Sequence, residues 1–159
     1  MKYTLTDNYK RINILLAEDD TDDQLFFSDS LTQINYSTSL TIVDNGTDAL
    51  GKLKYTEATP DIIFLDLNMP KMNGKECLKL IRENKRLKNI PCVILSTSSA
   101  LTDVEETYKL GANLFLVKPT GGFTLEKMIQ SVLQLDWQNY APPARGLYFF
   151  TETTYQKLK

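Results

Sequence analysis

Five short apolar segments alternate along this chain with five stretches whose apolar residues recur at helical spacing. The segments expected to form strands are Ile12–Ala17, Leu40–Val43, Ile62–Leu65, Cys92–Leu95 and Leu114–Val117. The third is apolar without interruption, as a strand covered by helices on both faces should be. Regular alternation of strands and helices predicts parallel strands joined by right-handed crossovers, and therefore an α/β fold.

The stretches with helical spacing follow these strands in turn. They are expected at Asp22–Ile34, Gly46–Tyr55, Gly74–Asn84, Thr102–Leu110 and Phe123–Leu135. In the first helix, the positions expected to face the core are Leu25, Phe26, Leu31 and Ile34. Gly111 predicts a left-handed cap after the fourth helix. At this size the pattern predicts a flavodoxin-like, doubly wound (βα)5 fold, with a parallel five-stranded sheet of order 2-1-3-4-5.

Composition narrows the classes of function. A length of 159 residues with 42% hydrophobic residues suits one domain with one core. The net charge of −2 argues against nucleic acid or anionic membranes as partners. The chain has no histidine, which excludes Ser–His nucleophiles and histidine metal ligands. No apolar run suits a signal peptide or a membrane span, so we expect a soluble, cytoplasmic protein with Cys77 and Cys92 as reduced core thiols.

Polar side chains follow four of the predicted strands. Glu18-Asp19-Asp20 comes after the first strand, Asp66 after the third, Ser96 after the fourth and Lys118 after the fifth. Each has an ordinary structural explanation, because acidic clusters cap helices and lone hydroxyls or lysines are common in turns. The carboxyl ends of parallel strands meet at one edge, however, and ligands of doubly wound sheets bind there. The four positions together therefore predict one shared site.

The chemistry of these groups suggests a metal and a phosphoryl group. Neighbouring carboxylates repel one another and raise each other's pKa, and a hard cation such as Mg²⁺ relieves that repulsion. A phosphoryl group on Asp66 would have its oxygens neutralised by Mg²⁺, the Lys118 ammonium and the Ser96 hydroxyl. Pro119 favours an extended backbone at Lys118, and a cis Lys118–Pro119 bond would help to aim the amine.

Four motifs occur in a characteristic order and spacing: ILLAEDD, DIIFLDLNMPKMNG, PCVILSTS and GANLFLVKP. With them, the region Ile12 to Leu135 resembles the receiver domain of two-component response regulators. It is most similar to the stand-alone receivers that serve phytochrome-type or hybrid histidine kinases. The resemblance implies a switch that accepts a phosphoryl group from a histidine kinase or a histidine phosphotransfer protein. Such a switch is not an enzyme, loses the group slowly by autodephosphorylation, and acts by changing a protein-interaction surface.

The resemblance also implies roles for individual residues. Asp66 is the phosphoacceptor, Lys118 pairs with the phosphoryl group, and Ser96 is the switch hydroxyl. Phe115 is the aromatic switch residue, and as a Phe it can rotate inward but cannot form an outward hydroxyl hydrogen bond. When Ser96 moves toward the phosphoryl group, Phe115 is expected to fill the space left behind.

The metal ligands implied by the resemblance are Glu18, Asp19, Asp66 and the backbone carbonyl of Asn68. Asp20 lies one position beyond the acidic pair and is expected to cap a helix instead. The side chains of Asn68 and Ser98 flank the path of attacking water and are expected to set the dephosphorylation rate.

Two other functions are compatible with an aspartate after a strand. A phosphatase of the haloacid-dehalogenase type also uses such a nucleophile, but it needs a second Asp two residues later, where this chain has Asn68. A degenerate receiver would act as an unphosphorylated interaction module. The presence of every implied site residue argues against that alternative.

The family pattern ends near Trp137, which predicts a receiver domain at 1–137 and a C-terminal extension at 138–159 without an output domain. Ala141–Ala144 has the composition of an extended linker. The following segment Gly146–Phe150 is too apolar for a solvated tail, so we expect it to pack on its own domain or on a partner chain. A homodimer could form through the extension or through the face made by the fourth helix, fifth strand and fifth helix.

Overall fold

A computed structural model of the chain describes residues 10–120, 122–137, 148–151 and 154. Its strands are β1 (Ile12–Ala17), β2 (Thr38–Val43), β3 (Ile62–Leu65), β4 (Cys92–Ser96), β5 (Leu114–Val117) and β6 (Phe149–Phe150). Its helices are α1 (Thr21–Thr32), α2 (Gly46–Tyr55), α3 (Gly74–Glu83), α4 (Leu101–Lys109) and α5 (Gly122–Leu133). The first ten elements confirm the predicted alternation, with ends that differ from the prediction by at most two residues.

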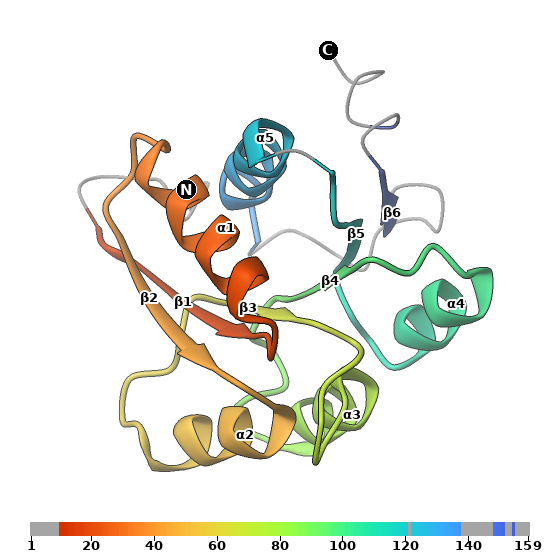
Figure 1. The fold of residues 1–159 in the computed structure, drawn as a ribbon. Coiled ribbons are helices and arrows are strands. Elements are labelled where there is room, and N and C mark those ends of the chain that lie inside the picture. Colours follow the sequence, from red (N-terminus) through yellow and green to blue (C-terminus); the bar gives the residue numbers. More distant parts are fainter. Residues whose placement is uncertain (1–9, 121, 138–147, 152–153, 155–159) are drawn as a thin grey trace.

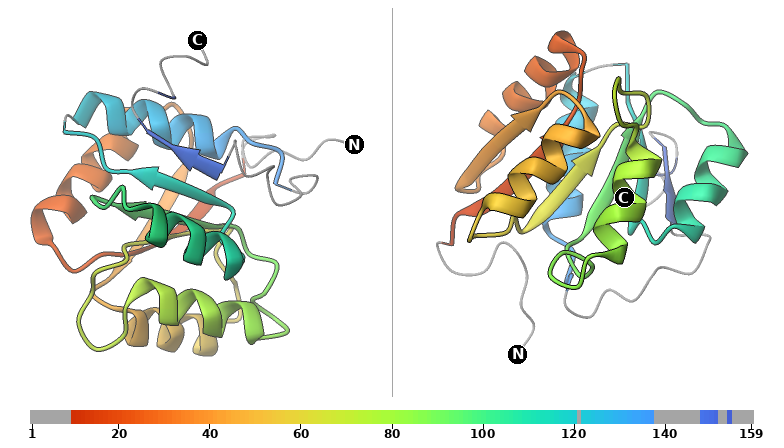
Figure 2. Two further views of the ribbon diagram at one scale, coloured as in Figure 1. Left: turned by 90° about the vertical axis from the view of Figure 1, so that its right-hand side faces the viewer. Right: turned by 90° about the horizontal axis from the view of Figure 1, so that it is seen from below.

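The strands form one parallel sheet of order β2-β1-β3-β4-β5-β6 (Figure 1). The first five positions confirm the predicted flavodoxin-like order. Helices α1 and α5 cover one face, and α2, α3 and α4 cover the other (Figure 2). Each face has its own apolar cluster, so the central strands are buried on both sides. This burial explains why β3 has no polar residue.

Among the described residues, the sheet extends the predicted five strands by a sixth at the β5 edge. The sixth strand comes from the C-terminal extension and pairs parallel with β5, with Phe115 opposite Phe149 and Leu116 opposite Phe150. A two-residue strand is too short to show periodicity. Its pairing depends on the free edge of β5, which exists only once the sheet has formed.

Two apolar residues of α1 were predicted to face the core but are exposed to solvent. Leu25 and Phe26 are 61% and 56% exposed, whereas Phe27 is buried and packs edge-on against Phe64 of β3. The buried positions Phe27, Leu31 and Ile34 define the true inner face of this segment. The error arose because three consecutive apolar residues cannot all point to one side of a helix.

Local signals in the sequence account for several turns. Asp20 caps α1, since its side chain accepts a hydrogen bond from the Asp23 amide at 2.9 Å, which confirms the predicted cap. Gly111 has a φ of 93°, as predicted for a left-handed cap. The described peptide bonds are all trans, including Lys118–Pro119. Cys77 and Cys92 are unpaired and buried, and burial raises their pKa values to about 12 and about 11.

The loop after β3 is packed closely against the start of α3. The Gly74 amide donates a hydrogen bond to the Leu67 carbonyl at 3.0 Å. A methyl group added at Gly74 would lie 2.2 Å from the carbonyl oxygen of Asp66. Helix α3 can therefore begin beside Asp66 only because residue 74 lacks a side chain.

None of the described helices is long and apolar enough to cross a membrane.

This packing predicts opposite effects of two glycine substitutions. Gly74→Ala should lower the free energy of unfolding by about 2 kcal/mol or more, because backbone atoms must shift to make room. Gly51→Ala, in α2, should raise it by roughly 0.5–1 kcal/mol, because the added methyl group meets no atom within 4 Å and alanine favours the helix. Urea denaturation of both variants measures the difference, and equal effects would contradict the described packing.

Candidate functional site

Backbone hydrogen bonds hold the ends of neighbouring strands in register around the predicted site. The Glu18 amide donates to the Val43 carbonyl, and the Asp66 amide donates to the Ala17 carbonyl, both at 2.9 Å. On the other side, the Lys118 amide donates to the Ser96 carbonyl at 2.8 Å. The ends of β1, β3, β4 and β5 therefore place their polar residues at one edge, as the strand order requires.

Three carboxylates from two of these strand ends converge. Glu18, Asp19 and Asp66 each offer an oxygen within 4.8 Å of the others. Glu18 and Asp66 are buried, with 2% and 6% of their surface exposed, whereas Asp19 is exposed. A set of hard oxygen donors with one side open to water fits a divalent cation that keeps part of its hydration shell. These residues could hold such a metal.

The same crowding changes the acidity of the buried pair. Burial raises the pKa of Glu18 and of Asp66 above the ordinary values, since a charge is less stable away from water. Neighbouring carboxylates raise both further, and the Lys118 ammonium opposes the shift. A cation bound between the carboxylates would favour their charged forms, so metal binding and proton release should be coupled.

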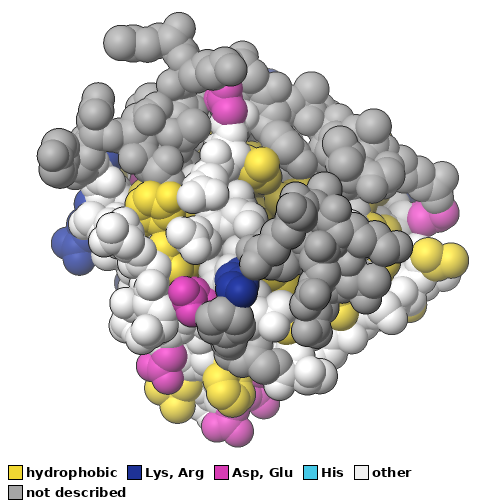
Figure 3. All heavy atoms as spheres, turned by 90° about the horizontal axis from the view of Figure 1, so that it is seen from above, with side chains coloured by type: hydrophobic (Ala, Val, Ile, Leu, Met, Phe, Trp, Pro, Cys, Tyr) yellow, Lys and Arg dark blue, Asp and Glu magenta, His cyan; other side chains and the backbone are white. Residues whose placement is uncertain are grey.

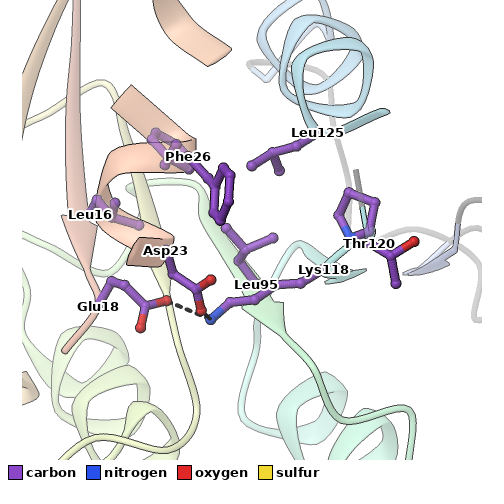
Figure 4. Close-up of a pocket in the computed structure, with 10 residues that line it drawn as sticks. Leu16, Glu18, Asp23, Phe26, Leu95, Lys118, Thr120 and Leu125 are labelled. Atoms are coloured by element: carbon purple, nitrogen blue, oxygen red, sulfur yellow. Dashed lines mark hydrogen bonds and ion pairs between the residues drawn. The ribbon is translucent and has the colours of Figure 1, made fainter. Parts of the chain in front are cut away.

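Lys118 is the cation of the site, and α1 supplies one of its partners. Its Nζ lies 2.6 Å from Glu18 Oε2 and 2.7 Å from Asp23 Oδ2 (Figure 4). The distance from Nζ to Asp66 Oδ1 is longer, at 3.5 Å. Burial alone would lower its pKa, but the hydrogen bonds to Asp23 and Glu18 raise it well above the ordinary value. Lys118 therefore stays charged, and both of its short contacts are directed to groups other than Asp66.

Asp23 is a site residue that the sequence reasoning missed. The predicted acidic cluster ended at Asp20 and did not include it. The available signal was its place in the first turn of the helix that starts directly after Glu18-Asp19. A side chain there points back toward the start of the helix, and hence toward this edge of the sheet.

Ser96 and Ser98 lie in a hydrogen-bonded loop between β4 and α4. The fully buried Ser96 hydroxyl accepts a hydrogen bond from the Ser98 amide at 3.2 Å. The Ser98 hydroxyl donates to Asp103 Oδ2 at 2.6 Å, and Asp103 pairs with Lys75 of α3 at 2.7 Å. These two contacts, with Lys75 the larger effect, hold the pKa of Asp103 below its usual range. The loop is thereby tied to two helices.

A cavity of about 250 Å³ opens beside Lys118. It lies between α1 and α5, where Phe26 and Leu125 point toward each other and Glu18, Asp23 and Lys118 form the polar end (Figure 4).

On the face seen from above Figure 1, the described Lys and Arg side chains stand in small separate groups (Figure 3). That part of the surface offers no broad basic patch.

The sequence profile of the response regulator receiver domain matches residues 14–130. The matched region includes the acidic residues, Asp66, Ser96 and Lys118, and it covers well over half of the 159 residues. The chain belongs to the response regulator receiver family. The predicted resemblance is thereby confirmed.

Relatives of known identity show which receivers this one resembles. Response regulator Rcp1 from Synechocystis is 36% identical over 124 residues, which cover 75% of this chain and 84% of Rcp1. The phosphorylated cyanobacterial phytochrome response regulator RcpA has a TM-score of 0.75 at 28% identity, covering 85% of this receiver and all of the RcpA chain. The Mn²⁺-bound form of Rcp1 has a TM-score of 0.71 at 33% identity, covering 84% and 99% of the two chains. The resemblance to phytochrome-type receivers is thus also confirmed.

The geometry predicts different consequences for two adjacent aspartates. Asp19→Ala should weaken divalent metal binding about tenfold or more, because it removes a charge from the carboxylate cluster. Asp20→Ala should bind metal almost as well as the parent but lose about 1 kcal/mol of unfolding free energy, because it removes the cap of α1. Calorimetric titration with Mg²⁺ and urea denaturation measure the two effects. Equal losses of metal affinity would show that the register of the acidic tract is misassigned.

Proposed function

We propose that this receiver accepts a phosphoryl group on Asp66 from a phosphohistidine of a histidine kinase or a histidine phosphotransfer protein, in the presence of Mg²⁺. The observation that carries the proposal is the arrangement around Asp66. Its carboxylate is buried, shares a cluster with Glu18 and Asp19, and has the Lys118 ammonium 3.5 Å away. Phosphoryl transfer requires carboxylates that can hold a metal cation, and it requires an amine close to the nucleophile.

In the proposed reaction an Asp66 oxygen attacks phosphorus, an O–P bond forms, and the P–N bond to the donor histidine breaks. Mg²⁺, held by Glu18, Asp19, Asp66 and the Asn68 carbonyl, would supply charge neutralisation for the phosphoryl oxygens. Lys118 would neutralise a further oxygen, which requires it to loosen its pairs with Glu18 and Asp23. Ser96 already accepts a hydrogen bond from the Ser98 amide, so its own proton is available for donation to the phosphoryl group.

The surface next to the site suits a protein donor. Leu25 and Phe26 are large apolar side chains exposed on α1, and Phe26 also lines the cavity beside Lys118. Exposed apolar groups next to a reaction centre favour contact with another protein. We infer that the donor packs against this side of α1 when it delivers its phosphoryl group.

Phosphorylation would act through a change in protein contacts, with slow loss of the group by autodephosphorylation. The surface that changes is proposed to be α4, β5 and α5, which also offers one route to a homodimer; the C-terminal extension offers another. The boundary between a receiver at 1–137 and an extension at 138–159 remains a prediction, as does the cytoplasmic location. The segment Gly146–Leu147 lies outside the described residues, whereas β6 packs on its own domain.

The acceptor can be identified by intact-mass measurement. The parent protein should gain one phosphoryl group from acetyl phosphate only when Mg²⁺ is present, because the crowded carboxylates need a counter-charge. Asp66→Asn should abolish the gain, and Asp61→Asn is a matched control because Asp61 lies at the opposite end of β3. Stoichiometric phosphorylation of Asp66→Asn would refute the assignment.

The lifetime of the phosphorylated form should depend on Ser98. Water must approach phosphorus in line with the Asp66 oxygen, and the small side chains of Asn68 and Ser98 would leave that route open. Ser98→Leu should slow decay roughly threefold or more without preventing phosphorylation, because the bulky side chain obstructs the approach of water. Ser98→Ala, which also loses the hydrogen bond to Asp103 but adds no bulk, should not slow decay. The exposed neighbour Ser99 provides the control, Ser99→Leu. If Ser98→Leu decays as fast as the parent after donor removal, water does not pass residue 98.

A further inference from the structure

The C-terminal strand β6 covers the part of the sheet that holds the aromatic switch residue. Phe115 of β5 is fully buried, and its ring centroid lies 5.8 Å from that of Phe149 and 6.4 Å from that of Tyr148. Tyr148 and Phe149 therefore pack against the Phe115 ring at this edge of the sheet. Figure 2 shows β6 alongside β5.

Tyr148, directly before β6, is anchored more firmly than a surface tail requires. It is fully buried, its ring packs edge-on against Tyr108 at 5.1 Å, and its hydroxyl donates a hydrogen bond to Thr107 Oγ1 at 2.7 Å. Thr107 is itself buried and donates to the Asp103 carbonyl, so the hydroxyl pair is satisfied. Tyr148 thus joins α4 to Phe115, and it supplies a hydroxyl that residue 115 does not have.

Ser96 lies in the same layer as these aromatic rings. Along β4 and β5, Ile94 pairs with Phe115 and Ser96 pairs with Val117. Because side chains alternate between faces along a strand, Ser96 and Ile94 point to the face that Phe115 and Tyr148 occupy. A shift of Ser96 toward Asp66 would leave a void in this layer, and voids in a close-packed core are costly.

We propose that Tyr148 is a positioning residue of the phosphorylation switch. Docking of Tyr148 and β6 holds Phe115 inward, where it fills the layer beside Ser96, and so favours the Ser96 position that binds the phosphoryl group. The inference rests on the proposed phosphorylation of Asp66. Because coupling between two events is reciprocal, phosphorylation must in turn stabilise the docked β6.

The reciprocal effect can be measured on the unmodified full-length protein. Beryllofluoride with Mg²⁺, a phosphoryl mimic, should slow hydrogen exchange of the backbone amides at 148–150. Unchanged or faster exchange there, with the mimic shown to be bound, would overturn the proposal. A parent protein that neither binds beryllofluoride nor gains a phosphoryl mass would instead refute the proposed function on which the inference rests.

Full-length variants test the forward effect. Tyr148→Ala should weaken beryllofluoride binding about tenfold, within the usual range of coupling between sites. Phe150→Ala is the matched control, since Phe150 belongs to the same strand but packs in the cluster on the opposite face, and its affinity should stay within about twofold of the parent. Tyr148→Phe keeps the ring and removes only the bond to Thr107. This variant should also weaken beryllofluoride binding, by a smaller factor than Tyr148→Ala. It provides the test if the alanine variant does not fold. Equal affinity in the parent and both Tyr148 variants would overturn the proposal.

Discussion

The crowding of negative charge around Asp66 is the constraint on which the site depends. Glu18, Asp19 and Asp66 lie within 4.8 Å of one another, and two of them are buried. Such a group is unstable without a counter-charge, because like charges repel strongly where water is excluded. In the structure Lys118 supplies that charge from β5, and Asp23 of α1 joins its hydrogen bonds. The strand ends are therefore linked by ionic contacts as well as by the sheet.

The ion pairs of Lys118 would have to change during the proposed phosphoryl transfer. A cation and a phosphoryl group would replace the ion pairs that Lys118 makes with Glu18 and Asp23. The proposed reaction would thus exchange one set of neutralising contacts for another, so that little uncompensated charge would be left buried at any stage. The loop containing Ser96 is tied through Ser98 and Asp103 to Lys75 of α3, so a shift of that loop reaches two helices.

The sixth strand changes the character of the surface expected to signal. In a sheet that ended at β5, Phe115 would border an open edge, and a partner could reach it directly. Here Tyr148 and Phe149 cover that residue, and Tyr148 is as buried as the core strands. A partner that binds α4 and β5 must therefore meet a surface that already includes Tyr148 and β6.

Much of the fold and of the site could be predicted from the sequence, because the signals are local. Apolar runs such as Ile62–Leu65 predicted the parallel sheet, and the motifs predicted which residues end its strands. Asp20 and Gly111 predicted turns because capping depends on residues nearby in the chain. Only the tertiary structure decided that Leu25 and Phe26 face outward, that Asp23 pairs with Lys118, and that β6 pairs with the edge of β5. The last two features join segments distant in sequence, and the partners in these contacts come together only after the chain has folded. The first depends on which side of α1 the sheet covers.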